Sequence, residues 1–438
     1  MFNFTFKLPN GLSNVSISIY TYGVLILLLF FLRPYPQAFL GAMAMRLIDM
    51  VVLGLPILFF LLNRTAEYLT IKVANICFIF FFLFLFGLYS LVNGYLMGIT
   101  KFNFRDPLDV IRYLQIPVFM LFGYYLALRS EFSVKNILSV FIIIILIIGV
   151  FAVMQKIMPI QFGFVTKLYA PEHQSEKLTS TERVTTIFGN PNTTALMACL
   201  LSSFILGCTL VKGFIKSFTV LTMLGICGLV VLLSGSRTGF IACGFLTIVY
   251  LFLRMRNKFM FILISVTFIF GVWLFRGLIL DVIKYFNYYL YVGIQIVLNL
   301  DFETLFAAGN TFSRRFDRWF IAIDLFRTSP IFGLGPLRGV VVSSTDNYYI
   351  YILLRNGIIG LSLYLFFVIY SLSIAIHGLK LTKEIKLFSY VYIFQTCIIL
   401  LMNFLIEAQI QNSVVYLHLT TLGILLGLMK QRINEKNI

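Results

Sequence analysis

Arginines stand beside amides, hydroxyls and acids in four short segments of the sequence, each at the edge of a long apolar run. These segments are ERVTTIFGNPNTTA (182–195), SGSRTG (234–239), NTFSRRFDRWF (310–320) and STDNYYIYILLRNG (344–357). The planar guanidinium group binds two phosphate oxygens at once, whereas the lysine ammonium group supplies a point charge. Arginines collected from several segments would therefore suit a phosphorylated ligand.

The first segment combines a helix start with a cation. Asn190 followed by Pro191 is typical of an N-cap and a first helical residue, so capping alone can explain both. Capping does not explain Arg183. We expect Arg183 near the same helix N-terminus, where anions are favoured.

The second segment predicts a tight turn between two apolar helices. Gly235 and Ser236 are residues that such a turn needs. Arg237 follows the turn, and it either extends toward lipid headgroups or points into a polar cavity.

The third segment has the spacing of an amphipathic helix. Arg314 lies three residues before Asp317 and four before Arg318, so these charges share one face. Phe316 and Phe320 lie on the opposite side. One interpretation is a helix on the membrane surface that is attracted to anionic lipid; the other is a set of cations at a binding site.

The fourth segment predicts a helix that begins at Asp346. Its polar residues would then lie within an arc of about 100°, and they are Asn347, Tyr348, Tyr351 and Arg355. Amides and tyrosines suit sugar hydroxyls. Asp346 itself is either a helix cap or a general base. The alternative bases are Asp317, Glu182 and His173.

Composition identifies the elements that must position these segments. Hydrophobic residues make up 60% of the 438 positions and 48 residues are phenylalanine, which is typical of a polytopic membrane protein. Because the runs have the length of helical spans and do not alternate as barrel strands do, we predict an all-α fold. The chain, 1–438, is expected to form a single integral membrane domain of about twelve spans. They are predicted near 18–32, 45–62, 73–93, 111–128, 135–154, 190–210, 217–233, 238–253, 259–275, 357–376, 387–405 and 412–429.

Charges in the connections orient these spans. Cations concentrate in the connections after even-numbered spans, such as RMRNK (254–258), and after the last span. By the positive-inside rule these connections and both termini are cytoplasmic. Two long loops, 155–189 and 276–356, are then extracytoplasmic, and the second is expected to hold interfacial helices. The N-terminal residues lack the pattern of a cleavable signal peptide.

The predicted cytoplasmic connections are too short for a nucleotide-binding domain. No Walker, HExxH or CxxC pattern occurs in the sequence, and all six cysteines lie in apolar runs. We therefore expect no cofactor, no metal and no nucleic-acid partner. A substrate would arrive already activated, on the membrane, from outside.

The order of these motifs resembles the O-antigen polymerase and O-antigen ligase superfamily. An arginine precedes GNPN, an SGSR turn follows, an arginine-rich helix with RRFDRW leads to PIFGLGP, and a D-N helix continues into NGIIGL, over roughly residues 180–376. The resemblance implies a fold like that of the GT-C glycosyltransferases. It also implies metal-independent transfer of a glycan from undecaprenyl pyrophosphate to a hydroxyl acceptor, on the periplasmic face of the bacterial inner membrane.

Residue roles follow from the resemblance. The family arginines that hold the pyrophosphate correspond to Arg183, Arg237 and Arg318, which would stabilise the charge that develops on the leaving group. Asp346 stands where the ligase branch has a histidine, and it would act as the catalytic base. The further substrate contacts would be Asn190, Asn192, Arg314, Arg315, Asn347, Tyr348, Tyr351 and Arg355.

The aspartate at 346 favours a polymerase, whose acceptor is a second lipid-linked repeat unit. Membrane lipids and a chain-length regulator are the expected partners. A ligase that transfers glycan to lipid A core is the alternative enzyme. A lipid-linked oligosaccharide flippase is a second alternative, although transporters usually bind near the midplane on broken helices. A structural or chain-length-regulating protein would not need so many spans and outer arginines.

Overall fold

The fold is taken from a computed structural model. It describes residues 4–6, 15–17, 19–32, 54, 56–57, 69–99, 105–129, 131–170, 183–211, 213–286, 288, 291–292, 294–295, 311–337, 345–408 and 412–436. The elements in chain order are β1 (Phe4–Phe6), β2 (Val15–Ile17), α1 (Ile19–Leu32), α3 (Ile71–Leu96), α4 (Arg105–Ala127), α5 (Val134–Ile157), α6 (Gly163–Tyr169), η2 (Thr186–Phe188), α8 (Pro191–Leu210), α9 (Ser217–Ser234), α10 (Arg237–Arg254), α11 (Lys258–Leu274), α12 (Arg276–Phe286), α15 (Thr311–Phe326), α16 (Tyr348–Gly378), α17 (Lys383–Met402) and α18 (Asn412–Lys436). The two strands form one short antiparallel pair at the N-terminal end.

The prediction of an all-α polytopic membrane protein is confirmed. Within the described ranges, nine helices are long and apolar enough to cross a membrane, and the bent pair of α11 and α12, with 70° between them, gives up to ten. Each of these coincides with a predicted span. The predicted span 18–32 corresponds to α1, which has 14 residues. The predicted span 45–62 lies outside the described residues except for 54, 56 and 57.

Packing contacts fix the relative directions of the helices. Phe204 near the end of α8 meets Phe388 near the start of α17, with 6.3 Å between ring centroids, so these two helices are antiparallel. α18 instead runs parallel to α4: Phe119 stacks on Tyr416 at 3.7 Å, and further along both helices Gln431 donates to the carbonyl of Arg129, just past the end of α4. The starts of α4, α8, α10, α16 and α18 consequently lie at one end of the bundle, together with the ends of α3, α5, α9 and α17.

We name the two ends of the bundle by their cations. The arginine end carries Arg183, Arg237, Arg315, Arg318 and Arg355, at or beside the starts of α8, α10 and α16 and along α15. The lysine end carries Lys72, Lys135, Lys216, Lys383 and Lys430, at the opposite ends of their helices. The separation is incomplete, because Lys156 and Lys167 lie at the arginine end and Arg254 at the lysine end.

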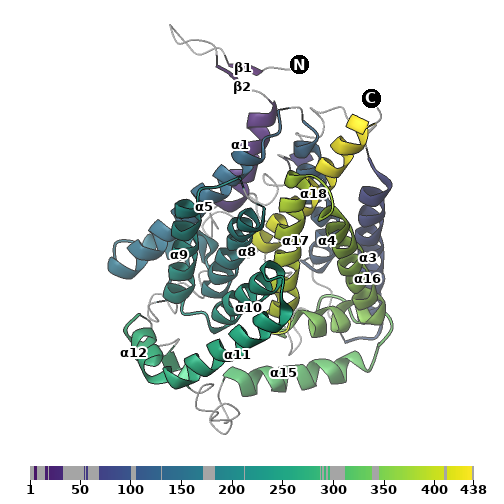
Figure 1. Cartoon of the computed structure of the whole chain (residues 1–438). Helices are drawn as coiled ribbons and strands as arrows, with labels where there is room; N and C mark the ends of the chain where they lie inside the picture. The colour runs from purple at the N-terminus through teal and green to yellow at the C-terminus, as the bar shows by residue number, and fades with distance from the viewer. Residues whose placement is uncertain are drawn as a thin grey trace.

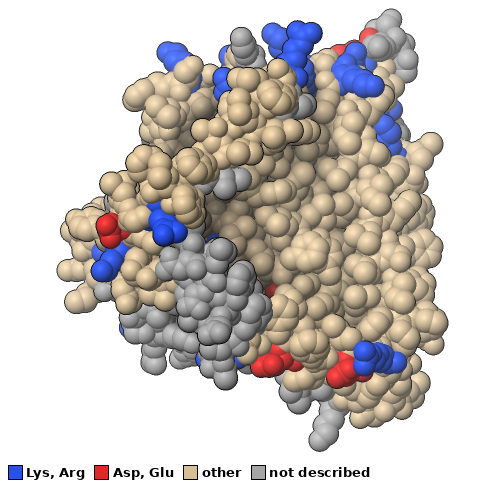
Figure 2. Space-filling model, turned by 60° about the horizontal axis from the view of Figure 1, so that its bottom comes forward, with Lys and Arg blue, Asp and Glu red and all other residues tan. Residues whose placement is uncertain are grey.

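The figures show where the two ends of the bundle lie. The start of α1 and the end of α18 lie together at the top, while α15 runs across the bottom (Figure 1). Figure 2 turns the bottom toward the viewer: lysines and arginines gather along the upper edge, and a broad surface below them carries almost no charged side chain. The bottom face is hollowed near its centre (Figure 2). A wide uncharged surface between two charged ends is the pattern expected of a chain that spans a membrane.

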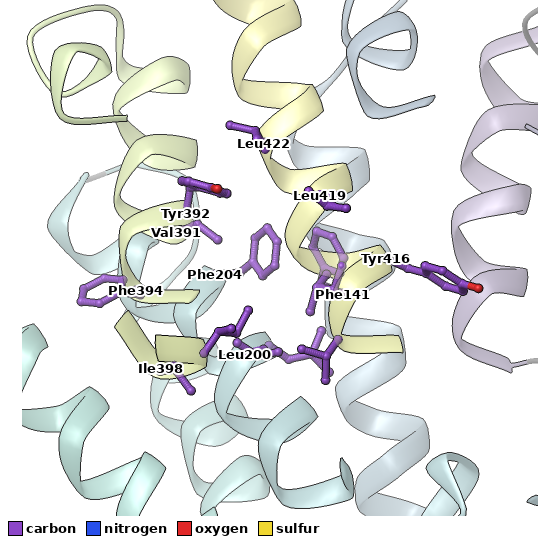
Figure 3. Close-up of a cluster of buried hydrophobic side chains, with 14 of the residues drawn as sticks. Phe141, Leu200, Phe204, Val391, Tyr392, Phe394, Ile398, Tyr416, Leu419 and Leu422 are labelled. Atoms are coloured by element: carbon purple, nitrogen blue, oxygen red, sulfur yellow. The ribbon is translucent and has the colours of Figure 1, made fainter. Parts of the chain in front are cut away.

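The hydrophobic core lies where α5, α8, α17 and α18 meet (Figure 3). Phe141 stacks on Phe204 with ring centroids 3.9 Å apart, and both rings are fully buried. α4 and α18 approach more closely than large side chains would allow: an added Cβ on Gly423 would lie 1.9 Å from the carbonyl oxygen of Met120. Small residues at such a crossing are typical of helix packing in membranes.

A kink at Gly357 divides α16 into a short first segment and a long spanning segment. Gly357 has φ 65° and ψ −166°, and an added Cβ would lie 2.1 Å from the carbonyl oxygen of Ile331. The N–H groups of Ile358 and Ile359 donate to the carbonyls of Pro330 and Ile331, at 2.9 and 3.3 Å. The segment that follows α15 therefore supplies the hydrogen bonds that the kink removes from the helix.

The exchange is reciprocal. Leu334 and Gly335 donate their N–H groups to the carbonyls of Leu354 and Arg355, each at 2.9 Å. Asn93 of α3 holds the same segment from the other side, through a 3.0 Å bond to the carbonyl of Gly333. The short segment 329–335 is thereby fixed between α3 and α16, and it orients α15 over the first segment of α16.

Candidate active site

Arg183 precedes a buried segment that leads into α8. Gln155 at the end of α5 organises this segment: its Oε1 accepts the N–H groups of Thr185 and Thr186, at 3.2 and 2.9 Å. Its Nε2 donates to the hydroxyls of Thr185 and Thr166, both at 3.3 Å. One buried glutamine thus forms hydrogen bonds with two N–H groups and two hydroxyl groups. These bonds fix the backbone just after Arg183, and so the position of Arg183 at the start of this segment.

Arg183 is bonded to two other segments. Its Nε donates to the carbonyl of Ser234 at 3.2 Å, and its Nη2 donates to Oδ1 of Asn192, also at 3.2 Å. The same Oδ1 accepts the hydroxyl of Ser236 at 2.9 Å. The first and second sequence segments therefore meet at Asn192. The prediction that Asn190 caps α8 is confirmed, since its Oδ1 accepts two N–H groups at the start of that helix.

Arg237 is the first residue of α10, directly after the predicted tight turn. Gly235 ends α9 in the left-handed region with φ 62°, and Ser236 caps α10 through a 3.0 Å bond from the N–H of Gly239. The turn is thus confirmed. Arg237 is partly exposed and begins its helix at the junction to which Arg183 is bonded.

The third and fourth segments meet at Asp346. Arg318 Nη2 lies 3.0 Å and Arg315 Nε lies 3.6 Å from Asp346 Oδ2. The indole N–H of Trp319 donates to the carbonyl of Thr345 at 2.6 Å. Consecutive turns of α15 therefore contact Thr345 and Asp346, the two residues that precede the cap of α16. Arg314 and Asp317, by contrast, have exposed side chains.

Asn347, and not Asp346, caps α16. Its Oδ1 accepts the N–H groups of Tyr349 and Ile350 at 2.9 and 3.2 Å. The predictions that α16 begins at Asp346 and that Asp346 could cap it are therefore wrong. Asp346 has φ 51°, in the left-handed region that aspartate tolerates better than most residues. Because Asn347 supplies the cap, the carboxylate of Asp346 can face α15.

The predicted polar stripe on α16 divides into a buried part and a part that lines a pocket. Tyr348 is buried, with its ring against Tyr364 at 5.1 Å and stacked on Tyr351 at 5.7 Å. The guanidinium carbon of Arg355 lies 4.0 Å from the centroid of the Tyr351 ring, and Arg355 Nη1 lies 3.8 Å from Asp109 Oδ2. Arg355 is therefore held by an aromatic face and a carboxylate from a different helix.

The pocket is small, with a cavity volume of about 20 Å³. Its remaining lining comes from α3, α4, the segment after α15 and the kink of α16. These residues are Gly87, Asp109, Val110, Tyr113, Gly335, Pro336 and Asn356. Tyr113 donates its hydroxyl to Oδ1 of Asn356 at 2.9 Å. Aromatic, amide and charged groups therefore line one small hollow, which is well below the size of an ordinary ligand pocket.

Glu407 was missed by sequence reasoning. It lies in the connection between α17 and α18, and its Oε1 accepts the N–H and the hydroxyl of Thr345, at 2.7 and 2.9 Å. Burial raises the pKa of its carboxyl group above the usual value of 4.5, and nearby Asp346 adds to this effect, while the Thr345 bonds and Arg355 oppose it. The sequence offered one signal for this residue: Glu407 is an acid in the short connection between two predicted spans. Its partners lie far away in the sequence.

The structure thus gathers the candidate residues into two groups at the arginine end. One contains Arg183, Asn190, Asn192 and Arg237; the other contains Arg315, Arg318, Asp346, Tyr351, Arg355 and Glu407. Two of the alternative bases, His173 and Glu182, lie outside the described residues. Asp317 is exposed on α15.

Comparison with models of protein families gives a match in the second half of the chain. Residues 221–365 match the family model described as O-antigen ligase. This range is about a third of the chain and contains Arg237, Arg318, Asp346 and Arg355, whereas Arg183 precedes it and Glu407 follows it. No curated protein matches the chain significantly.

Proposed function

We propose that this chain, which matches the O-antigen ligase family model over residues 221–365, is a glycosyltransferase that polymerises lipid-linked glycan repeat units. The donor would be a glycan on undecaprenyl pyrophosphate and the acceptor a sugar hydroxyl of a second repeat unit. A GT-C-like fold and metal independence are parts of the same proposal. The lysine end would face the cytoplasm and the arginine end the periplasm.

The observation that carries the proposal is the meeting of arginines from separate segments at one end of a membrane bundle. Arg315 and Arg318 share the carboxylate of Asp346, and Arg355 is held over Tyr351. A pyrophosphate carries several negative charges beside the membrane surface, and such a group is bound best by preorganised guanidinium groups. The geometry therefore suits a lipid pyrophosphate better than a neutral ligand.

In this proposal Arg183, Arg237 and Arg318 stabilise the leaving pyrophosphate. The glycosidic C–O bond breaks with the electron pair moving to the phosphate oxygen, so negative charge grows in the transition state. Cations fixed before the reaction stabilise that state without the cost of reorganisation. The carboxylate of Asp346 orients Arg315 and Arg318.

A ligase is the second candidate, because the matching family model is described as an O-antigen ligase. The two enzymes share the donor and the leaving group, and they differ in the acceptor. Asp346, where the ligase branch has a histidine, favours the polymerase.

The test supplies purified protein in liposomes with lipid-linked repeat units, with and without lipid A core. A polymerase produces a ladder of lipid-pyrophosphate-linked glycans, whereas a ligase transfers glycan to lipid A core. Movement of the lipid-linked units across the bilayer without any change in glycan length would identify a flippase and overturn the proposal.

The variants R183A, R237A and R318A should each abolish the ladder while the protein still inserts. R327A is the matched control. Arg327 is 74% exposed, and in the described part of the chain its ion-pair partner is Asp324, which is 69% exposed. A normal ladder from all three site variants would contradict the assignment of the arginines.

A further inference from the structure

We infer that Glu407 is the general base that accepts the proton of the acceptor hydroxyl. The inference rests on the proposed function and adds a residue from the connection between α17 and α18 to the same site. Three observations carry it: the rigid placement of this connection, the contacts of the carboxylate, and the contrasting position of Asp346.

The connection is bonded directly to the start of α16. The N–H of Tyr348 donates to the carbonyl of Asn403 at 2.7 Å, and Asn347 Nδ2 donates to the carbonyl of Phe404 at 3.4 Å. Asn403 in turn donates to the hydroxyl of Tyr364 at 2.8 Å. Glu407 is therefore positioned by backbone bonds that join two helices, as a preorganised catalytic group requires.

The carboxylate of Glu407 lies beside the arginine cluster. Both donors of Thr345, the residue before Asp346, reach the same oxygen, Oε1. The neighbours Ile406 and Ala408 are buried, and the side chain of Glu407 is itself only partly exposed. A carboxylate fixed by these bonds in a partly apolar setting has the geometry that a general base needs.

Among the residues that the structure describes, charged and titratable groups near Glu407 come from three segments. Asp346 precedes α16, Arg355 and Tyr351 lie on the first segment of α16, and Arg315 and Arg318 approach Asp346 from α15. Burial raises the pKa of Glu407, so its carboxylate is a stronger base than that of an ordinary glutamate.

Asp346 occupies the opposite kind of position. Its Oδ2 lies within 3.6 Å of Arg315 and 3.0 Å of Arg318. An acid held between two guanidinium groups is suited to orienting them, whereas proton transfer from a sugar would require it to leave those contacts. The two neighbouring acids therefore take different roles: Asp346 orients Arg315 and Arg318, and Glu407, which is bonded to Thr345, accepts the proton.

The proposed step balances as follows. The acceptor O–H gives its proton to the Glu407 carboxylate while the oxygen forms a bond to the anomeric carbon of the donor. The bond from that carbon to the phosphate oxygen breaks, and lipid pyrophosphate leaves with the electron pair. The protonated Glu407 then releases its proton to water.

The experiment compares E407Q and D346N with the wild-type chain in liposomes. Glutamine keeps an oxygen that can accept both Thr345 donors, so E407Q preserves the local structure and removes only the basic carboxylate. We expect E407Q to lower the elongation rate about a hundredfold or more, with binding of the lipid-pyrophosphate donor unchanged and with the ascending limb of the pH–rate profile lost. E407D should restore part of the rate. D324N, on the exposed surface of α15, is the control.

The outcomes separate this inference from the proposed function. If the wild-type chain elongates no glycan, the proposed function fails. If the wild-type chain elongates and E407Q does so at the same rate with the same pH profile, the role of Glu407 is overturned while the function stands. A loss of donor binding or of folded protein in E407Q would assign Glu407 a structural role and also overturn the inference.

Discussion

Arg318 in α15 lies 3.0 Å from Asp346, which directly precedes the cap of α16. The pair joins a helix at the arginine end to the first segment of a spanning helix. Its side chains are 35% and 31% exposed, so an anionic ligand can reach the guanidinium group without breaking the pair. Asp346 therefore orients the side chains of Arg315 and Arg318, which leads to the first prediction.

Replacing Asp346 with asparagine should disturb the orientation of Arg315 and Arg318 without lowering the affinity for the donor. Asparagine also tolerates the left-handed backbone at this position, so the change removes mainly the charge. We expect elongation to fall about tenfold or more because Arg315 and Arg318 lose their fixed orientation. Donor affinity should not fall, because no cation is lost. Steady-state rates and donor binding to the same preparation measure both quantities, and weaker donor binding in D346N would contradict this role.

Arg183 should not be replaceable by lysine. Its Nε and Nη2 bond to different segments, the carbonyl of Ser234 and the side chain of Asn192, and one ammonium group cannot reproduce this fork. We expect R183K to lose elongation nearly as fully as R183A. N192A should show a smaller loss, since it removes only one partner of Arg183. Wild-type elongation in R183K would mean that the charge alone is sufficient.

Gly357 should be intolerant of alanine. An added Cβ would lie 2.1 Å from the Ile331 carbonyl oxygen, and its φ of 65° disfavours any side chain. We expect G357A to destabilise the protein by about 2 kcal/mol or more, seen as a lower thermal midpoint in detergent. G225A is the control, because nothing lies within 4 Å of an added Cβ there. An unchanged midpoint in G357A would contradict the role of the kink.

The raised pKa of Glu407 predicts a pH dependence of stability. A carboxyl whose folded-state pKa is raised favours folding most at low pH, and this contribution is lost as the pH rises through the folded-state pKa. The neutral side chain in E407Q cannot show this loss. We therefore expect E407Q to gain stability relative to wild type as the pH rises above 4.5, the ordinary pKa of a glutamate carboxyl group. Thermal midpoints of both proteins, measured as the pH rises, test this expectation. If the midpoint of E407Q fell relative to that of wild type with rising pH, the expectation would be contradicted.

The proposed orientation can be tested by labelling. Single added cysteines at exposed positions, R327C at the arginine end and K72C at the lysine end, should differ in their reaction with an impermeant maleimide. In intact spheroplasts we expect R327C to react and K72C to react only after the membrane is opened. The wild-type chain, with its native cysteines, measures the background. The reverse pattern would invert the proposed orientation.

Much of the architecture was predictable because it depends on local sequence. Spans follow from continuous apolar runs, so the nine long helices of the described ranges and the bent pair coincide with predicted spans. The caps and turns at Asn190 and Gly235 follow from residues whose short-range chemistry has few alternatives. The gathering of arginines at one end follows from the alternation of span directions.

What the tertiary structure decided is which side chains meet. The sequence by itself determined a polytopic helical bundle with arginines at one end, but the capping role of Asn347, the pairing of Arg315 and Arg318 with Asp346, and the contact between Glu407 and Thr345 join segments far apart in the chain. Local patterns constrain only neighbours within a few residues. Contacts between distant segments depend on how the helices pack, and here the kink at Gly357 and the end of α17 bring the acids and arginines together.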